Sequence, residues 1–297
     1  MSRDMRRASQ HLRLIGNHLH ARNYHNVLVG SKYSSSFKQY LQLSNGEIGS
    51  YFHDVPLDLD VDTKTCNMIV EVPRWSNGKF EISKTEPFNP ITQDIKKGKP
   101  RFVNNIFPYH GYIHNYGAIP QTWEQPLIEV LPGFKGDNDP LDCCEIGSNI
   151  AKMGDVKKVK LLGSLALVDD GELDWKVICI DIEDPIAIKL NKLADVDTFM
   201  PGLLDATRTW FRDYKIPTGK QPNVFAFEGE YQDQASTLST VQECHEAWNA
   251  LVKGEIKADG SEVEIPSIVR AGTHIRVEPN QQNDTPIPQE VNKWYYV

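Results

Sequence analysis

The sequence lacks the marks of a membrane protein and of a disulfide-bonded secreted protein. No run approaches the roughly eighteen apolar residues that a membrane-spanning helix needs, so we expect no such segment. Cysteines are few and odd in number, and none belongs to a Cys-x-x-Cys pair: they are Cys66, Cys143, Cys144, Cys179 and Cys244. We therefore expect neither a disulfide framework nor a zinc site, and free thiols are typical of a reducing compartment.

The chain also lacks internal repeats, low-complexity tracts and Ser/Gly-rich linkers. Its 297 residues would allow one large domain or two small ones, and the missing linker favours one. A formal charge of −8 argues against a nucleic-acid partner, because such proteins usually present a basic face. The negative charge does not exclude an anionic substrate, since bound divalent cations reverse the field locally.

Acidic residues are nearly absent from the N-terminus. Residues 1–31 contain five arginines and a single acid, Asp4, and the first glutamate is Glu47. Four apolar residues between positions 12 and 19 could form one side of a basic amphipathic helix. This profile predicts a mitochondrial transit peptide over 1–31 and a location in the mitochondrial matrix. A disordered basic tail on a cytoplasmic protein is the alternative. We expect the folded domain over 32–297.

The densest group of acidic residues lies in the run Gly-Asp-Asn-Asp-Pro-Leu-Asp-Cys-Cys-Glu-Ile-Gly, residues 136–147. An extended backbone places Asp137 and Asp139 on the same side, and a turn at Pro140 can bring Asp142 back toward them. Three carboxylates this close repel one another unless a cation neutralises them, and oxygen ligands suit Mg²⁺. A surface turn explains this run equally well. An EF-hand is excluded, because Leu141 stands where that loop needs a ligand.

Other charged and aromatic residues recur at strand-like positions. Asp169 and Asp174 flank a predicted hairpin turn between the strand-like runs 156–168 and 177–182. Lys79 and Glu81 alternate on one face of another strand, and a tyrosine-rich segment covers 107–117. Each of these patterns has an ordinary structural explanation when taken alone, as a solvated turn, an outward strand face or an aromatic core.

Together these segments resemble the family I soluble inorganic pyrophosphatases of the eukaryotic type. The family's Asp-x-Asp-Pro-x-Asp signature stands here at 137–142, and its other blocks follow in order from about Lys32 to the C-terminus. Among these blocks are Val-Pro-Arg-Trp-Ser-Asn-Gly-Lys, Gln-Asp-Ile-Lys-Lys-Gly-Lys, Tyr-Gly-Ala-Ile-Pro-Gln-Thr-Trp-Glu, Gly-Glu-Leu-Asp-Trp-Lys and Trp-Phe-Arg-Asp-Tyr-Lys-Ile-Pro. Asp-Cys-Cys-Glu at 142–145 and the terminal Trp-Tyr-Tyr-Val resemble the fungal mitochondrial members.

The resemblance implies an α+β fold, mostly β, in which an OB-like closed five-stranded β-barrel carries peripheral helices. It also implies a homodimer. From the residues alone, short alternating strands are expected between 67 and 182. Apolar residues at helical spacing predict helices over 203–214 and 238–251, and the Pro- and Asn-rich segment beyond 256 indicates an extended tail.

The family's activity implies that this chain hydrolyses inorganic pyrophosphate with Mg²⁺. Two divalent ions about 3.5–4 Å apart can activate a shared water for in-line attack. By resemblance, Asp137, Asp142 and Asp174 hold the first metal, and Asp142 bridges to the second. Asp139 is the expected general base. The remaining implied metal ligands are Glu81, Asp169 and again Asp174, with Glu71 supporting them from behind.

The cationic half of the implied site contacts phosphate oxygens through Lys79, Arg101 and Lys215. The resemblance further implies hydrogen bonds to phosphate from Tyr116 and Tyr214, and orientation of Asp174 by Lys176. Tyr112 is often given a proton-donor role in this family. We rank it below Asp139, because an unperturbed phenol is a poor acid at neutral pH.

Two rival functions are disfavoured by the sequence. A broader nucleotide or polyphosphate hydrolase would want a Gly-rich phosphate loop, and no Gly-x-x-x-x-Gly-Lys occurs. An OB-like module that binds anionic polymers would line a basic groove with aromatics, whereas here the cations alternate with carboxylates.

Overall fold

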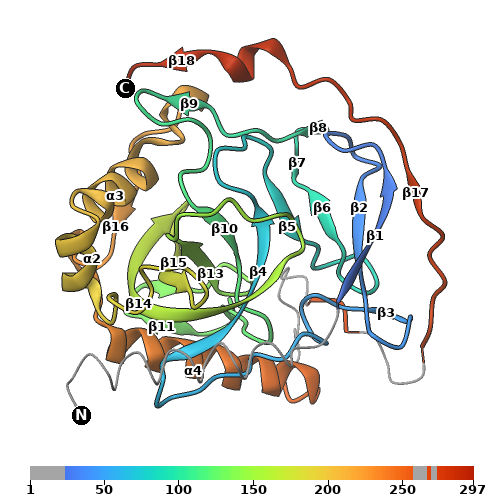
Figure 1. Cartoon of the computed structure of the whole chain (residues 1–297), viewed down its shortest axis with the longest axis horizontal. Helices are drawn as coiled ribbons and strands as arrows, with labels where there is room; N and C mark the ends of the chain where they lie inside the picture. Colours follow the sequence, from blue (N-terminus) through green and yellow to red (C-terminus); the bar gives the residue numbers. More distant parts are fainter. Residues whose placement is uncertain (1–23, 257–265, 269–272) are drawn as a thin grey trace.

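The computed structural model describes residues 24–256, 266–268 and 273–297 and has two six-stranded sheets with helices at the periphery (Figure 1). The mostly-β α+β class that the resemblance implied is confirmed. No helix of the described part is long and apolar enough to cross a membrane. Most of the predicted transit peptide, residues 1–23, lies outside the described residues.

Five strands of one sheet pair in a ring. They are β4 (Thr65–Val72), β10 (Asn115–Ala118), β13 (Asp142–Glu145), β14 (Val156–Asp169) and β15 (Glu172–Asp181). Their order is β15–β13–β10–β4–β14, and β14 pairs again with β15, so that every strand of the five has two partners. The β13–β15 pair is parallel and the others are antiparallel. β16 (Val224–Phe225) adds to β14 outside the ring.

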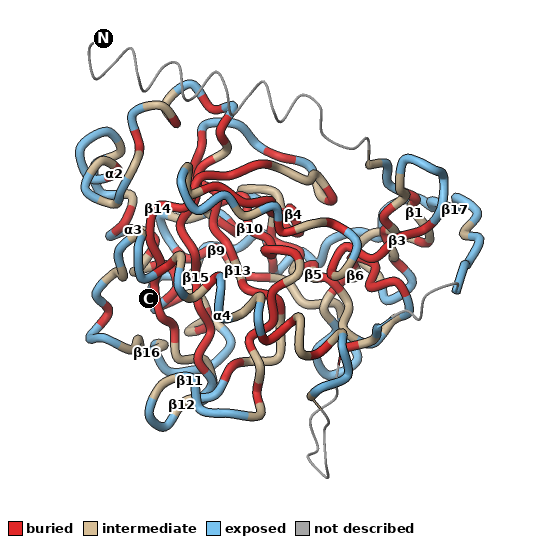
Figure 2. The backbone as a smooth tube through the Cα atoms, turned by 90° about the horizontal axis from the view of Figure 1, so that it is seen from below, coloured by how far each residue is buried: buried red, intermediate tan, exposed pale blue. Residues whose placement is uncertain are grey.

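Most residues of the ring strands are buried, and both faces of the strands are covered (Figure 2). In β4, Met68 and Val70 pack in one apolar cluster, whereas Ile69 packs in another. Successive side chains of a strand point to opposite faces, so alternate residues of one strand serve two cores. Charged residues that remain on these strands are therefore held in buried surroundings.

The second sheet contains the N-terminal strands and one strand from the C-terminal tail. Its order is β17 (Asn280–Gln281), β1 (His25–Gly30), β2 (Lys38–Gln42), β6 (Ile91–Gln93) and β5 (Phe80–Ile82), with β3 (Ile48–Gly49) beside β2. β1 pairs with β2 from His25 onward. The folded region therefore begins before residue 32, where the sequence placed its start. The sequence did not predict this strand, because it follows directly on the basic N-terminal segment.

The described part of the tail, residues 266–268 and 273–297, is mostly extended, as expected, and residues 273–297 run along the outside of the molecule (Figure 1). β17 pairs in parallel with β1, and β18 (Trp294–Tyr295) pairs in parallel with β9 (Asn105–Ile106). A short 3₁₀ turn, Gln289–Asn292, precedes β18. Two small hairpins, β7 (Ile95–Lys96) with β8 (Lys99–Pro100) and β11 (Glu129–Leu131) with β12 (Phe134–Lys135), complete the strands.

Three α-helices of the described residues flank the ring: α2 (Leu193–Phe199), α3 (Leu203–Asp213) and α4 (Gln234–Val252). α3 matches the expected 203–214 closely. α4 begins four residues before the expected 238, because the Asp233 side chain accepts a hydrogen bond from the Ser236 N–H and caps a polar first turn. α2 was not expected. Trp210 and Phe211 on α3 are buried beside the strands that carry the candidate site.

Candidate active site

Most of the residues that the sequence singled out line one polar cavity. They are Lys79, Arg101, Tyr112, Tyr116, Asp137, Asp139, Asp142, Asp169, Asp174, Lys176 and Tyr214. Glu71 and Glu81 line an adjoining recess that shares Lys79 and Asp142 with the cavity. Lys215 is placed at the same site by its ion pair with Asp169. The structure thus brings the whole predicted set together.

Strand register explains much of this convergence. Asp142 opens β13 directly beside Lys176 of β15 in the parallel pair. Asp174 lies two residues before Lys176 and therefore on the same face of β15. Lys176 Nζ lies 2.5 Å from Asp142 Oδ2 and 2.5 Å from Asp174 Oδ1. Tyr116 on β10 donates to the same Asp142 oxygen. One buried ammonium thus links two carboxylates of the cavity.

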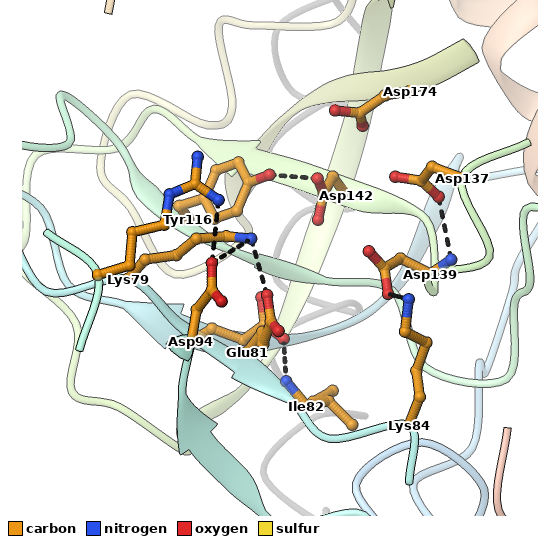
Figure 3. A network of polar contacts seen from close by, with 12 residues as sticks. Lys79, Glu81, Ile82, Lys84, Asp94, Tyr116, Asp137, Asp139, Asp142 and Asp174 are labelled. Carbon is orange, nitrogen blue, oxygen red and sulfur yellow. Dashed lines mark hydrogen bonds and ion pairs between the residues drawn. The ribbon is translucent and has the colours of Figure 1, made fainter. Parts of the chain in front are cut away.

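Asp174 also belongs to a second group of carboxylates. Glu124, Asp137 and Asp174 offer oxygens that lie within 4.8 Å of one another. Glu124 was not assigned a role from the sequence, although it ends the Tyr-Gly-Ala-Ile-Pro-Gln-Thr-Trp-Glu block. Its Oε1 accepts from the Trp175 N–H at 3.1 Å, whereas its buried Oε2 has no hydrogen-bond partner. Figure 3 shows Asp137, Asp142 and Asp174 turned toward a common space.

Burial makes these carboxyls hard to ionise. Burial raises the pKa of Asp174 to about 7, and Asp142 adds to the rise while Lys176 opposes it. Burial and then neighbouring carboxylates also hold the pKa values of Asp137 and Glu124 well above the usual range. A bound divalent cation would remove this penalty, because it compensates the charges where they lie. The donor set and the unpartnered Glu124 oxygen therefore fit a hard divalent ion.

The opposite side of the cavity is cationic and is organised by an acid that the sequence reasoning missed. Asp94 Oδ2 lies 2.9 Å from Arg101 Nη1 and 3.4 Å from Lys79 Nζ (Figure 3). Lys79 Nζ also lies 2.7 Å from Glu81 Oε2. Although burial acts against it, Lys79 and Arg101 together hold the pKa of Asp94 below its ordinary value. The two cations are thus charged and fixed in place.

The tyrosines are buried against aromatic neighbours. The Tyr214 ring stacks on Trp210 with centroids 4.9 Å apart, and Tyr112 lies 5.2 Å from the same indole. Burial raises the pKa of Tyr112 to about 12, although Lys79 and Arg101 oppose the rise. A phenol this weak keeps its proton at neutral pH. It can donate a hydrogen bond, but it is a poorer proton-transfer group than a carboxylate here.

Asp139 and Glu71 occupy distinct positions at the edge of the carboxylate group. Asp139 Oδ1 lies 2.6 Å from Nζ of Lys84, a residue that the sequence reasoning did not single out (Figure 3). Glu71 on β4 is buried and accepts a hydrogen bond from the Ile82 N–H at 2.7 Å. It therefore fixes the strand that carries Glu81 from behind, which is the position expected of a supporting residue.

The cavity has a wall of buried carboxylates facing fixed lysine, arginine and tyrosine side chains. Such an arrangement is typical of enzymes that bind a phosphorylated anion together with divalent metal ions. The carboxylates provide oxygen ligands for the metal, and the opposite wall provides hydrogen-bond donors for phosphate.

Comparison with known proteins assigns the family. The family model described as inorganic pyrophosphatase matches residues 68–249. The mitochondrial inorganic pyrophosphatase of Saccharomyces cerevisiae is 55% identical over 301 aligned residues, which cover 100% of this chain and 96% of the relative. The inorganic pyrophosphatase of Kluyveromyces lactis is 50% identical over 91% of this chain and 96% of its own length.

A solved structure agrees with this assignment. The structure of inorganic pyrophosphatase from Schistosoma japonicum has a TM-score of 0.82 with this chain at 43% identity, and the match covers 92% of this chain and 100% of that one. The chain belongs to the inorganic pyrophosphatase family, as the sequence resemblance predicted.

Proposed function

We propose that this chain hydrolyses inorganic pyrophosphate to two orthophosphates with Mg²⁺ at the described cavity. The observation that carries the proposal is the meeting of the buried carboxylate group with the Lys79–Arg101 wall in one cavity. Bound Mg²⁺ would supply a water of lowered pKa and neutralise substrate oxygens. The ligands we propose are Asp137, Asp142 and Asp174, and we add Glu124 because of its unpartnered buried oxygen.

Asp139 is the residue we propose to take the proton from the attacking water. It belongs to the same cavity, and its side chain is 36% exposed against 9% for Asp174, so solvent can remove the proton afterwards. Tyr112 contacts the cavity as a hydrogen-bond donor. We propose that Tyr214 donates to a phosphate oxygen in the same way, and that Tyr116 does so by giving up its hydrogen bond to Asp142.

Two ion pairs of the cavity offer a cation and an acid that suit a substrate bound to metal ions. Lys79 pairs with Glu81, and Lys215 pairs with Asp169. In each pair the cation suits a phosphate oxygen and the acid suits a metal ion. When a metal–pyrophosphate complex enters, each partner can exchange its intramolecular contact for a contact with the complex. The exchange leaves no buried charge unpaired, which limits its cost.

A substrate panel tests this proposal. Phosphate release is measured from pyrophosphate, tripolyphosphate and ATP at equal concentration and excess Mg²⁺. Fast release from pyrophosphate, with little from the longer chains, supports the narrow substrate. Equal or faster release from tripolyphosphate and ATP would instead support the broader phosphoanhydride hydrolase. No release from any of them, with steeply salt-dependent binding of anionic polymers, would support the binding module.

We further infer that the ring of five strands is the OB-like closed barrel that the family resemblance implied. We also propose a homodimer. An exposed aromatic surface formed by Phe107, Trp294 and Tyr296 supports it, since an apolar patch of this kind is typical of an interface. The Phe107 ring centroid lies 5.7 Å from that of Trp294. Sedimentation of the intact chain and of Trp294→Glu tests this proposal, because the variant should shift toward monomer.

We propose the mitochondrial matrix as the location. The support is the arginine-rich, acid-poor N-terminal segment together with the mitochondrial relative from Saccharomyces cerevisiae. Import of the full chain into isolated mitochondria, followed by protease protection, tests this location, and a chain left outside would favour the cytoplasmic alternative. The folded part is proposed to be one domain.

A further inference from the structure

Lys84 reaches the cavity from the loop that follows β5. Its Nζ lies 2.6 Å from Asp139 Oδ1 (Figure 3), and the two side chains are 28% and 36% exposed. The Asp139 backbone is fixed from the other side, because its N–H donates to Asp137 Oδ1 at 3.0 Å and its C=O accepts from the Glu124 N–H at 2.9 Å. The ion pair with Lys84 therefore determines which way the carboxylate turns.

The loop that carries Lys84 is closed on itself. The Ser83 N–H donates to Pro90 O at 2.9 Å, and the Asn89 N–H donates to Glu86 O at 3.0 Å. The Asn89 side chain then donates to Ser83 O at 3.0 Å and accepts from the Ser50 hydroxyl at 2.7 Å. These bonds hold both ends of the loop, but none of them involves the backbone of Lys84.

A distant segment of the chain, Pro266–Ile268, fixes that backbone. The Ser267 N–H donates to Lys84 O at 2.6 Å, and Ser267 O accepts from Asn89 Nδ2 at 3.2 Å. His53 Nε2 lies 3.1 Å from the same Ser267 oxygen, while His53 Nδ1 accepts from Trp248 Nε1 of α4 at 2.9 Å. Because Nδ1 is an acceptor, Nε2 carries the proton and donates to Ser267. Both backbone groups of Ser267 are thus bound.

We propose that Lys84 is a positioning residue for Asp139, and that Ser267 holds the Lys84 loop in place through its backbone. The proposal rests on the proposed role of Asp139 in proton transfer. A partly exposed ion pair contributes little to stability. Its effect is on orientation, because carboxylate rotation is otherwise loosely restrained. A proton acceptor turned away from the attacking water slows the reaction without weakening substrate binding.

The first test replaces Lys84. Lys84→Gln should lower kcat for pyrophosphate about 10-fold and leave KM within about twofold, because the reaction and not the binding depends on the orientation of Asp139. Lys84→Arg keeps a cation and should recover most of the loss. Lys84→Gln with wild-type kcat would overturn the proposal. A raised KM at unchanged kcat would also overturn it, since Lys84 would then bind substrate.

The second test distinguishes the role of the Ser267 backbone N–H from that of the Ser267 side chain. Ser267→Pro removes the N–H that binds Lys84 O and should lower kcat about threefold, whereas Ser267→Ala keeps the N–H and should match wild type. In a Lys84→Gln background, Ser267→Pro should have no further effect on kcat, because the contact through which it acts is gone. If the double variant instead loses kcat by the product of the two single losses, Ser267 does not act through Lys84.

The two proposals fail in different ways. If the wild-type chain releases no phosphate from pyrophosphate with Mg²⁺, the proposed function fails. If the wild type is active and the Lys84 and Ser267 variants retain its kcat and KM, only the positioning proposal fails. Thermal unfolding of each variant is measured beside the kinetics, and a lowered kcat counts only where the midpoint matches wild type.

Discussion

Single carboxyl groups of the cavity are held in surroundings that oppose their charge. Glu124 is 3% exposed, and one of its oxygens has no hydrogen-bond partner. The pKa values of Glu124, Asp137 and Asp174 are all raised, first by burial and then by neighbouring charges. In a metal-free chain these groups therefore reduce stability at neutral pH. The same groups become stabilising once a divalent cation lies among them.

Replacing Glu124 should separate these two effects. We expect Glu124→Gln to raise the free energy of unfolding of the metal-free protein by on the order of 1 kcal/mol at pH 8, because a buried charge is removed. We also expect it to weaken Mg²⁺ binding about 10-fold, as measured by calorimetry. Glu246→Gln, on the exposed face of α4, is the control and should change neither. Unchanged Mg²⁺ affinity in Glu124→Gln would rule out a ligand role.

Asp139 and Asp142 should respond differently to the same substitution. Asp139→Asn should keep Mg²⁺ and pyrophosphate binding but lower kcat roughly 10²–10⁴-fold, the usual effect of a lost general base. Asp142→Asn should weaken Mg²⁺ binding first, because its carboxylate is a proposed metal ligand that is also held by Lys176. Steady-state kinetics over a Mg²⁺ titration distinguishes the two. Near-normal turnover of Asp139→Asn across pH would refute its assignment as the base.

The residues that the sequence reasoning missed are those whose significance comes from contacts that form only in the folded chain. Asp137, Asp139 and Asp142 were found because they are adjacent in sequence and match a family signature. Glu124 meets Asp174 only after strands β13, β14 and β15 have formed. Asp94 and Lys84 likewise gain their significance from ion pairs across loops. Composition and spacing contain no signal for such contacts.

At the scale of elements, apolar periodicity predicted α3 almost to its ends and missed the first turn of α4. That turn, Gln-Ala-Ser-Thr, has no apolar stripe and depends on the Asp233 cap. Strand β1 was not predicted, because it follows the basic N-terminal segment. Its partners β2 and β17 come from opposite ends of the chain. The β14–β15 hairpin was predicted from the residues. The β13–β15 pairing that completes the ring was implied only by family resemblance, because strand periodicity does not specify which edges meet.

The contact between β10 and α3 should make stability depend on pH. His114 directly precedes β10, is buried against Phe211, and has its Nε2 2.9 Å from the Thr207 hydroxyl of α3. Burial, with a smaller effect of Arg74, lowers its pKa to about 3. The unfolded chain protonates near pH 6.5, so the contribution is complete above pH 6.5 and is lost as pH falls toward 3.

Denaturant unfolding at pH 7, 6 and 5 measures this effect. The free energy of unfolding should fall by up to about 1.4 kcal/mol per pH unit from His114 alone once pH is below 6.5. Acids of raised pKa act in the opposite direction, so the comparison is made with His114→Gln, which retains them. The wild type should lose more stability on acidification than His114→Gln. Parallel pH profiles would show that His114 is not held neutral.

For the whole molecule, metal binding and stability should be linked through the cavity acids. Mg²⁺ binds the ionised carboxylates, and the pKa of Asp174 is raised to about 7. Each tenfold rise in Mg²⁺ above its dissociation constant should therefore stabilise the fold by about 1.4 kcal/mol at pH 8. The midpoint shift at pH 6 should be smaller, because protons compete for the same oxygens. Thermal unfolding over a Mg²⁺ series at both pH values checks this, and equal shifts would contradict it.

The C-terminal tail contacts several parts of the molecule that are distant from it in the sequence. It pairs with β1 through β17, with β9 through β18, and with the Lys84 loop through Ser267. The sequence indicated an extended tail, but its attachment sites are backbone contacts that leave no side-chain pattern. The edge of the cavity that carries Lys84 therefore depends on residues more than a hundred positions away.

The most direct test of the central claim is phosphate release from pyrophosphate by the intact chain during a Mg²⁺ titration that begins in excess chelator. We predict no turnover in chelator, because the carboxylates alone cannot activate water or neutralise the substrate. Release should then appear and saturate as Mg²⁺ is added. Undiminished release in chelator would contradict the assignment of the buried carboxylate group as the metal site of a pyrophosphatase.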